Sequence, residues 1–564
     1  MASVAAQSVP RVRAEAPITF KCVVICSFAA FGGILFGYDS GYINGILAMN
    51  KFHHDFGVPS NDANAFGGYL LPSYQKSLMT SILSLGTFLG ALVAGWAADS
   101  WGRRNTNILG CVIYIVGVVL QTVAEGSVGL LTAGRAVGGL GVGFVSATVI
   151  MYVSEITPKS IRGRVVGGYQ FAITIGIFLS ACVNLGTKDR TDTGAYRIPI
   201  ALQFAWALIL GVGLCFFPES PRYFVMKGNG ESALKSLARL RGQPIDSSYV
   251  TDEHDELVES WNQEIAAGAG SGGFGDCFKG GLRKGSNLHR TLIGTSVQVV
   301  QQLTGVNFIF YFGTSFFKTI GIKNAFIISI ILGAVNVAST PVAFWTIDKW
   351  GRRPLLIWGA LGMSLCEFVV AIVGTTTGDS SAAHKTLIAF VCVYIFFFAS
   401  TWGPTGWAVS GEVFPLTIRS KGIALSTASN WLLNFVIAFV TPYFVDEDKA
   451  DLGSKVFFIW GSTCACAVVY AYAVVYETKG LSLESCDRMM RQVHPWQSAG
   501  WRDEVVGIVG DVEGALGANV QGTGVAAAVP APEAPPMREQ RRSWSNVFKR
   551  GSTSSSESGG SKEK

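Results

Sequence analysis

The stretch Asp99-Ser100-Trp101-Gly102-Arg103-Arg104 returns later in the chain as Asp348-Lys349-Trp350-Gly351-Arg352-Arg353, at an offset of 249 residues (348 − 99). Each copy lies in a basic gap between two long apolar runs. A gap of this kind is typical of a short loop joining two membrane spans.

A second pattern repeats at nearly the same offset. Glu155 and Arg162 are separated by six residues, and so are Glu412 and Arg419, at an offset of 257 residues (412 − 155). Two agreeing offsets indicate two related halves in tandem. Membrane proteins built from such repeats are often carriers, because a site between the halves can open to one side at a time.

The composition supports a membrane protein. Of the 564 residues, 49% are hydrophobic and only 15% are charged, and the net charge is +6. Soluble domains carry about 25% charged residues. The basic residues cluster between apolar runs and not on one face, which excludes nucleic acid as a partner. No metal-ligand spacing or disulfide framework is visible among the 11 cysteines.

Apolar runs of about 20 residues, long enough to cross a bilayer as helices, occur twelve times and divide six and six. They are 22–47, 77–98, 106–124, 128–152, 165–186, 199–217, 290–313, 323–347, 354–374, 386–411, 421–444 and 455–475. We predict an all-α membrane protein with these parts: N-terminal tail 1–21, six-helix bundle 22–217, helical linker 218–289, second bundle 290–479 and disordered tail 480–564.

The basic residues also predict orientation. They concentrate in alternate gaps, as at Arg103-Arg104 and Arg352-Arg353, and these gaps are expected to face the cytoplasm. The linker and both termini then lie on the same side. The Ser-rich end, 552–561, suggests cytoplasmic regulators that bind the tail, although an inert tail explains its composition equally well.

Two charged residues fall at membrane depth. Asp39 lies in the middle of the first run, and Arg135 lies near the start of the fourth. Each is costly alone in a bilayer and tolerable as a pair. Burial favours a neutral carboxyl and a nearby Arg favours an ionised one, so the pair can switch protonation when its geometry changes. The sequence leaves proton coupling and a static pair equally open.

The repeated strings place acids and bases at the predicted cytoplasmic helix ends. Ion pairs there can hold one conformation and break in another. Basic residues alone would serve only as orientation signals, but the acids and the repetition favour a gate. The predicted gating residues are Asp99, Arg103, Arg104, Glu155 and Arg162, with Asp348, Arg352, Arg353, Glu412 and Arg419.

Uncharged amides form the last group of polar residues in the runs. An amide offers a donor and an acceptor in one plane, which suits the paired hydroxyls of a sugar. One buried amide usually joins two helices, but many of them with aromatic neighbours favour a polar ligand cavity. The amides are Gln170, Gln301, Gln302, Asn307, Asn336, Asn430 and Asn434, and the aromatic residues include Phe36, Tyr311, Trp402 and Trp407.

Three further motifs carry a resemblance over about residues 22–480. They are Pro218-Glu219-Ser220-Pro221-Arg222, Gln301-Gln302-Leu303-Thr304-Gly305-Val306-Asn307 and Tyr476-Glu477-Thr478-Lys479-Gly480. All three resemble signatures of the sugar porter branch of the major facilitator superfamily. The segment Thr401-Trp402-Gly403-Pro404-Thr405-Gly406-Trp407 is similar to that of fungal hexose transporters.

The resemblance implies a major facilitator fold of twelve helices in two bundles, and transport of a monosaccharide by alternating access. It also implies that Asp39 and Arg135 match the charged residues of proton-coupled members. The sugar site that it implies comprises Phe36, Gln170, Gln301, Gln302, Asn307, Asn336, Trp407 and Asn430.

These observations predict a plasma-membrane hexose transporter, with glucose as the expected sugar and a proton as the coupled ion. It is not expected to be an enzyme and needs no cofactor. The alternatives that remain open are a uniport facilitator, a glucose sensor that does not transport, and a polyol carrier.

Overall fold

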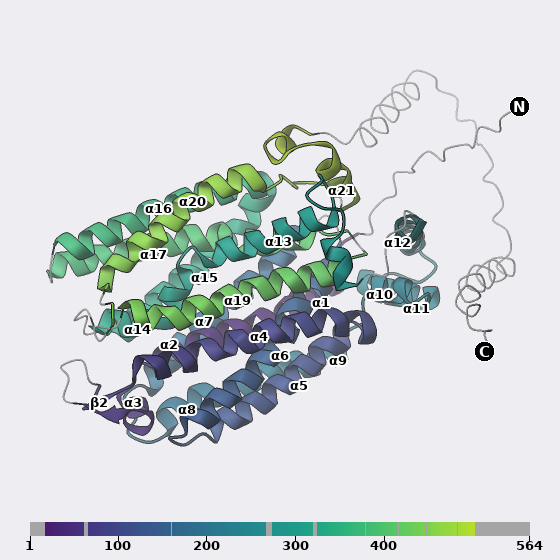
Figure 1. The fold of residues 1–564 in the computed structure, drawn as a ribbon. Helices are drawn as coiled ribbons and strands as arrows, with labels where there is room; N and C mark the ends of the chain where they lie inside the picture. The colour runs from purple at the N-terminus through teal and green to yellow at the C-terminus, as the bar shows by residue number, and fades with distance from the viewer. Residues whose placement is uncertain are drawn as a thin grey trace, which may run out of the picture. The chain divides into compact units, whose positions relative to one another are not determined.

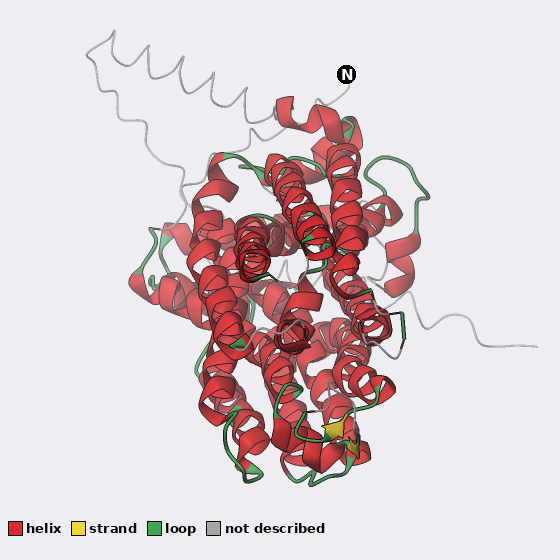
Figure 2. Ribbon diagram, turned by 90° about the vertical axis from the view of Figure 1, so that its left-hand side faces the viewer, coloured by secondary structure: helices red, strands yellow, loops and turns green. Residues whose placement is uncertain are grey.

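The computed structural model describes residues 17–60, 66–158, 161–266, 273–319, 324–377, 380–415, 417–445, 449–450, 452–481 and 483–501, and all of them belong to one compact unit, Met1–Asp503. Helices make up nearly all of this unit, and the two short strands form a single small pair (Figure 2). Each of the twelve apolar runs is helical over most of its length in the described residues. This confirms the predicted all-α membrane fold.

The first half contains six spans. Their helices are α1 (Phe20–Ala30) with α2 (Gly32–Ile46), α4 (Ser73–Trp101), α5 (Arg103–Thr122), α6 (Val128–Ile156), α7 (Arg162–Thr187), and α8 (Gly194–Ala201) with α9 (Gln203–Cys215). Helix α3 (Asn50–Phe56) and the antiparallel strands β1 (Val58–Pro59) and β2 (Tyr69–Leu70) follow the first span. We call the end of the bundle with α3, β1 and β2 the hairpin end.

Short helices connect the two halves. They are α10 (Pro221–Met226), α11 (Gly230–Arg241), α12 (Ser248–Ala266) and the 3₁₀ turn η2 (Phe274–Phe278). Arg241 pairs with Glu253 at 2.6 Å and donates to the carbonyl of Ile156 at 2.8 Å, which joins α11 and α12 to the end of α6. Helices α10–α12 lie at the opposite end of the bundle from α3 (Figure 1). We call this end the linker end.

The second half repeats the arrangement. Its helices are α13 (Asn287–Gln302) with α14 (Val306–Thr319), α15 (Ala325–Lys349), α16 (Arg352–Thr376), α17 (Ser381–Ser400) with α18 (Trp402–Glu412), α19 (Arg419–Val445), and η3 (Gly453–Lys455) with α20 (Val456–Val474). The halves contact each other through α4 with α19, α2 with α14, and α7 with α15.

Eleven helical stretches in the described residues are long and apolar enough to cross a membrane. The remaining span, the seventh in chain order, is the pair α13 and α14, of 16 and 14 residues, which is interrupted at 303–305. Neither piece reaches the length of about 20 residues that crosses a bilayer. Together they complete the six-plus-six arrangement that the apolar runs predict.

Small residues allow close packing within the first half. A methyl group added at Gly86 of α4 would lie 2.4 Å from the carbonyl oxygen of Ala136 on α6, and one at Gly139 would lie 2.2 Å from that of Leu83. The two backbones therefore touch. Such contacts hold helices together in lipid, where burial of apolar surface gives little driving force.

The first part of the predicted disordered tail is helical. Helix α21 (Leu483–Gln492) and the 3₁₀ turn η4 (Pro495–Gly500) occupy the start of the expected disordered tail 480–564. Met489 and Met490 on α21 are fully buried, so its apolar side packs against the bundle. The composition of the whole tail hid this short amphipathic helix. Residues 502–564 and the predicted N-terminal tail up to residue 16 lie outside the described residues.

Candidate functional site

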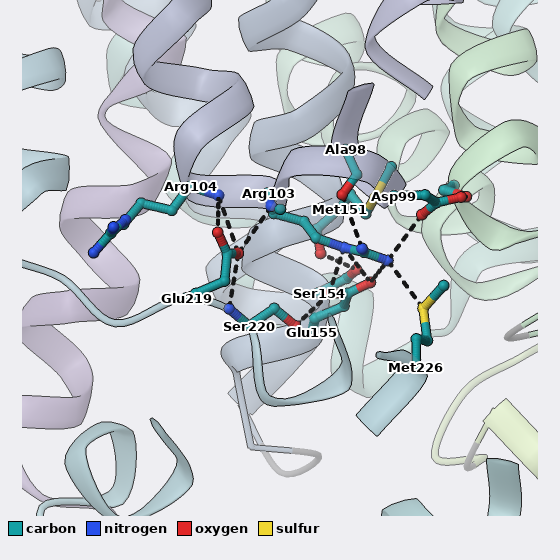
Figure 3. Close-up of polar contacts among 12 residues, drawn as sticks. Ala98, Asp99, Arg103, Arg104, Met151, Ser154, Glu155, Glu219, Ser220 and Met226 are labelled. Carbon is teal, nitrogen blue, oxygen red and sulfur yellow. Dashed lines mark hydrogen bonds and ion pairs between the residues drawn. The ribbon is translucent and has the colours of Figure 1, made fainter. Parts of the chain in front are cut away.

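At the linker end, a buried polar network surrounds the first copy of the repeat (Figure 3). The Arg103 guanidinium pairs with Glu155 of α6 at 3.1 Å and with Asp99 of α4 at 3.3 Å. The Ser220 hydroxyl donates to Oε2 of Glu155, the oxygen that lies 3.1 Å from Nε of Arg103. Because the arginine and the glutamate are both nearly inaccessible, loss of one partner would strand the other charge, at a cost of about 3–5 kcal/mol.

Glu219 completes this network at the N-terminus of α5. Its carboxylate accepts from the backbone N–H of Arg103 at 2.8 Å and from that of Arg104 at 3.1 Å. An acid at a helix N-terminus satisfies free N–H groups and the helix dipole. Gly102 precedes the helix with φ +94°, and a methyl group there would lie 2.3 Å from the Glu219 carboxylate. Burial raises the pKa of Glu219, against the opposing effect of these N–H groups.

The second half builds the same network. Arg352 pairs with Glu412 at 2.7 Å, and the Thr478 hydroxyl donates to Glu412 at 2.6 Å. The Glu477 carboxylate accepts from the backbone N–H of Arg352 at 3.0 Å. Glu477 and Thr478 therefore take the places of Glu219 and Ser220.

Sequence reasoning gave no role to these two glutamates. The signal was present, because Glu219-Ser220 and Glu477-Thr478 stand 258 residues apart (477 − 219), close to the offsets of the other two repeats. These glutamates are the third acid that repeats in the two halves, one after the sixth span and one after the twelfth. Their repetition predicts that they are partners of the repeated Gly-Arg-Arg strings.

Two ion pairs at the linker end join the halves. Asp99 of α4 accepts from the Ser420 hydroxyl of α19 at 2.7 Å and pairs with Lys421. Arg164 of α7 pairs with Asp348 of α15 at 2.9 Å. The first pair is largely buried, with 17% of the Asp99 side chain and 10% of the Lys421 side chain exposed, whereas the second is open to solvent.

The other predicted gating residues play different parts. In the described residues, Arg104 and Arg353 do not pair with acids. Their guanidiniums donate to the carbonyls of Phe217 at 3.0 Å and Tyr472 at 2.8 Å, which lie at the ends of the sixth and twelfth spans. Arg419 donates to the carbonyl of Phe414 at 3.0 Å. The side chain of Arg162 lies outside the described residues.

The hairpin end is also closed between the halves. The Asn44 side chain on α2 accepts from the backbone N–H of Thr314 on α14 at 3.0 Å. The Lys318 ammonium, also on α14, donates to the carbonyl of Ala48 at 3.2 Å. Contacts at both ends therefore hold the region between the halves shut.

Amides from several helices meet between these two ends, but they fall into two groups. In the first group, Gln301 donates to the carbonyls of Trp402 at 2.9 Å and Gly403 at 3.1 Å, and Asn430 donates to Gln301 at 3.0 Å and Gln298 at 2.7 Å. These amides are engaged inside the protein. They fix α13 against α18 and α19.

The second group joins the two halves. Asn434 of α19 donates to the Gln302 carbonyl at 3.3 Å, and Asn307 donates to the same oxygen. Asn434 itself accepts from Tyr311 at 3.1 Å and from Ser84 of α4 at 2.8 Å. Sequence reasoning listed Asn434 only as an amide and did not include Ser84.

Several buried polar atoms near these amides have no hydrogen-bond partner among the described residues. Both amide atoms of Asn336 are unpartnered, although the residue is only 1% exposed. The Trp431 indole N–H and the Tyr169 hydroxyl are also unpartnered. Each such atom costs about 1–3 kcal/mol unless a ligand satisfies it. A hydroxyl group that reached these atoms would recover this cost.

Aromatic rings accompany these atoms. Phe36 packs edge-on against Trp431 with centroids 4.7 Å apart, and Tyr169 against Trp407 with centroids 5.8 Å apart. Gln170, one residue after Tyr169, faces α18, because a methyl group at Gly403 would lie 3.2 Å from its amide nitrogen. The structure thus brings predicted residues of both halves to one region.

Asp39 and Arg135 are both fully buried, but none of the contacts of the described residues joins them directly. The Arg135 guanidinium donates to the Tyr42 hydroxyl and lies 5.4 Å from the centre of that ring. Tyr42 in turn donates to Gln121 at 2.6 Å. Both Asp39 oxygens are unpartnered. Sequence reasoning missed Tyr42, which lies one helical turn after Asp39 and so on the same face of α2.

Comparisons with known proteins agree with this arrangement. A family model described as "Sugar (and other) transporter" matches residues 25–490. The chain is 46% identical over 486 residues to the major facilitator-type transporter ecdD of Aspergillus rugulosus, covering 84% of this chain and 88% of that protein. It is 44% identical over 485 residues to the probable glucose transporter rco-3 of Neurospora crassa, covering 84% and 80%.

A further relative is the high glucose sensor RGT2 of Saccharomyces cerevisiae, which is 42% identical over 473 residues, covering 83% of this chain and 61% of the sensor. Among solved structures, the proton:xylose symporter XylE bound to 6-bromo-6-deoxy-D-glucose superposes with a TM-score of 0.72 at 27% identity, covering 83% of this chain and 99% of that one. Inward-open XylE from E. coli gives a TM-score of 0.64 at 25% identity, covering 83% and 100%.

The family model spans most of the chain, and each of these relatives matches more than four fifths of it. The repeated networks, the amide cluster and all of the spans except the first turn of α1 fall within the residues that the family model matches. The chain therefore belongs to the sugar transporter family of the major facilitator superfamily.

Proposed function

We propose that this protein carries a hexose, with glucose as its preferred sugar, across the plasma membrane by alternating access and in symport with a proton. The observation that carries the proposal is the set of buried polar atoms without hydrogen-bond partners on α7, α15 and α19, which includes both amide atoms of Asn336. Contacts at the hairpin end and at the linker end enclose it.

The chemistry of these atoms favours an uncharged cargo. Asn336 offers a donor and an acceptor, and Trp431 and Tyr169 add further donors. The rings of Phe36 and Trp407 supply apolar faces for a sugar ring. We assign the sugar contacts to Phe36, Gln170, Gln302, Asn307, Asn336 and Trp407, and a supporting role to Gln301 and Asn430, because these two amides fix α13 against α18 and α19.

The proton site in this proposal is Asp39. A carboxylate at this depth without a partner is costly, so Asp39 is protonated in the closed state and Arg135 is held by Tyr42 instead. Tyr311 lies within electrostatic range of both Asp39 and Arg135 and also donates to Asn434. A change of charge at Asp39 can therefore reach the amides that bind the sugar.

Alternating access then requires the two sets of contacts to open in turn. We place the linker end in the cytoplasm, with both termini. Inward opening separates Asp99 from Lys421 and Arg164 from Asp348. Outward opening separates Asn44 from the N–H of Thr314 and Lys318 from the carbonyl of Ala48. The lower TM-score with inward-open XylE than with sugar-bound XylE supports a state here that differs from the inward-open one.

The test measures sugar accumulation by cells that lack their own hexose carriers and have an imposed inward pH gradient. The Asp39→Asn variant should bring glucose to equilibrium without concentrating it, and glucose should no longer alkalinise the medium. Asp55→Asn is the matched control, because it removes a carboxylate in α3, outside the spans. Uphill accumulation by Asp39→Asn would refute the assignment, and uptake without alkalinisation by the unmodified protein would identify a uniport facilitator.

A sensor is the second candidate, favoured by the identity of 42% with the high glucose sensor. A sensor would bind glucose without moving it. Reconstituted vesicles distinguish the two, since a transporter fills them with labelled glucose. Binding without filling would favour the sensor. Competition by polyols in the same vesicles tests whether the site also accepts open-chain cargo.

A further inference from the structure

The seventh span is interrupted where α13 gives way to α14. Gly305 in the interruption has φ +82°, a left-handed conformation that favours glycine. The carbonyl of Leu303 accepts from the Thr463 hydroxyl at 2.6 Å, and that of Thr304 accepts from the Tyr394 hydroxyl at 2.7 Å. Side chains of α20 and α17 thus satisfy the carbonyls that the break exposes, as a membrane interior requires.

A carboxyl group that belongs to none of the motifs or networks described above lies next to this break. Glu367, in the middle of α16, is 1% exposed, and among the described residues its oxygens accept from no N–H or O–H group, so that the Cys464 thiol is their one, weak, donor. A methyl group at Gly305 would lie 3.0 Å from one of these oxygens. The carboxyl therefore packs against the residue at which the span bends.

The groups around Glu367 supply no positive charge. The titratable side chains near it are Cys366 on its own helix, Tyr394 on α17 and Cys464 on α20. The Cys464 thiol already donates to the carbonyl of Thr304 at 3.7 Å. An ionised carboxylate at this position would face three groups that ionise only to anions, in a medium where a lone charge is expensive.

The break separates two functional parts of the seventh span. Gln302 precedes it and Asn307 follows it, and α14 then continues to the Thr314 and Lys318 contacts that close the hairpin end. Opening of that end must move α14 relative to α13. Such a movement changes the packing at Gly305 and with it the surroundings of the Glu367 carboxyl.

We propose that Glu367 is a second proton-binding group of the transport cycle, which holds a proton while the seventh span is bent over the sugar and exchanges it with water when α14 moves away. The carboxylate gains the proton from hydronium as an O–H bond, and loses it to water in the reverse step. This inference rests on the proposed transport function but is independent of the role of Asp39.

The test follows sugar exchange in proteoliposomes that have equal sugar and equal pH on both sides, since exchange requires no pH gradient. The measurement runs from about pH 6 to about pH 9, and a step that needs one bound proton slows about tenfold per unit above its midpoint. In the unmodified protein, exchange should fall at the alkaline end. Glu367→Gln, a permanent neutral mimic of the acid, should still exchange sugar and should lose this fall.

Ser364→Ala is the matched control. Ser364 lies on the same helix, and its hydroxyl donates to the carbonyl of Gly461 on α20 at 2.8 Å, so the variant removes a contact between α16 and α20 without removing a titratable group. It should keep the alkaline fall. Superimposable profiles for Glu367→Gln and the unmodified protein would overturn the proposal, because they would show a carboxyl that never releases its proton.

A third variant keeps the test decisive if Glu367→Gln does not fold. Glu367→Asp retains a carboxyl but withdraws it from Gly305, so the midpoint of the alkaline fall should shift, and an unchanged midpoint would overturn the proposal. The Asp39 assignment can fail separately, since Asp39→Asn is judged by uphill accumulation and Glu367→Gln by exchange.

Discussion

The ion pair between Asp99 and Lys421 should control how often the linker end opens. Replacement of Asp99 by Asn keeps the shape of the side chain and removes its charge. Lys421 then loses its partner while 10% of its side chain is exposed, and the Ser420 hydroxyl keeps only a neutral acceptor. The pair of Arg103 with Glu155 lies within one half, so opening between the halves does not require it to break.

The size of the effect follows from the burial of the pair. Hydrogen bonds to charged groups contribute about 1.5–3 kcal/mol, and partial exposure places this pair near 2 kcal/mol. The interaction exists only when the linker end is closed. Its loss should therefore raise the population open at that end about 30-fold.

Hydrogen–deuterium exchange of the purified protein measures this opening. Amides in the last turn of α4 and the first turn of α19 should exchange faster in Asp99→Asn, by up to about 30-fold. Asp348→Asn is the control, because it breaks the other pair between the halves, which is solvent-exposed and worth about 0.5 kcal/mol, or about twofold. Equal effects of the two variants, or faster exchange only at the hairpin end, would refute the reasoning.

Three further predictions concern single residues. Asn336→Leu should raise the KM for glucose at least about tenfold without lowering thermal stability, because its amide is unpartnered in the described structure, and uptake kinetics with a melting curve check both parts. Gly305→Ala should destabilise the protein by about 1–2 kcal/mol, seen as a lower melting temperature, since φ is +82° and the methyl group would lie 2.6 Å from the Trp460 ring. Burial raises the pKa of the Glu219 carboxyl above its unfolded value, so the native state binds a proton there more readily than the unfolded state. The stability from this group therefore falls as pH rises through the interval between the unfolded and the folded pKa. Melting temperatures across that interval should show this fall in the unmodified protein and not in Glu219→Gln; parallel curves would contradict it.

The fold could be predicted from local properties of the chain. Three features predict the fold, and all of them can be recognised in the linear sequence without any packing information. They are the apolar runs of bilayer length, the basic residues in alternate gaps, and the repeats at offsets of 249 and 257 residues. The bilayer strengthens this link, because a segment in lipid must satisfy its own backbone as a helix. The sequence shows a helix-loosening glycine, Gly305, in this run, but it does not show the break at 303–305, because distant side chains satisfy the carbonyls there.

Partnership between residues was decided by the tertiary structure. The sequence placed Asp39 and Arg135 at membrane depth as a pair, yet the arginine on α6 donates to Tyr42 on α2. It grouped seven amides by type, yet packing engages Gln301 and leaves Asn336 unpartnered. Glu367 drew no notice as one acid in an apolar run. Hydrogen bonds act over about 3 Å, and only the folded chain determines which groups meet at that distance.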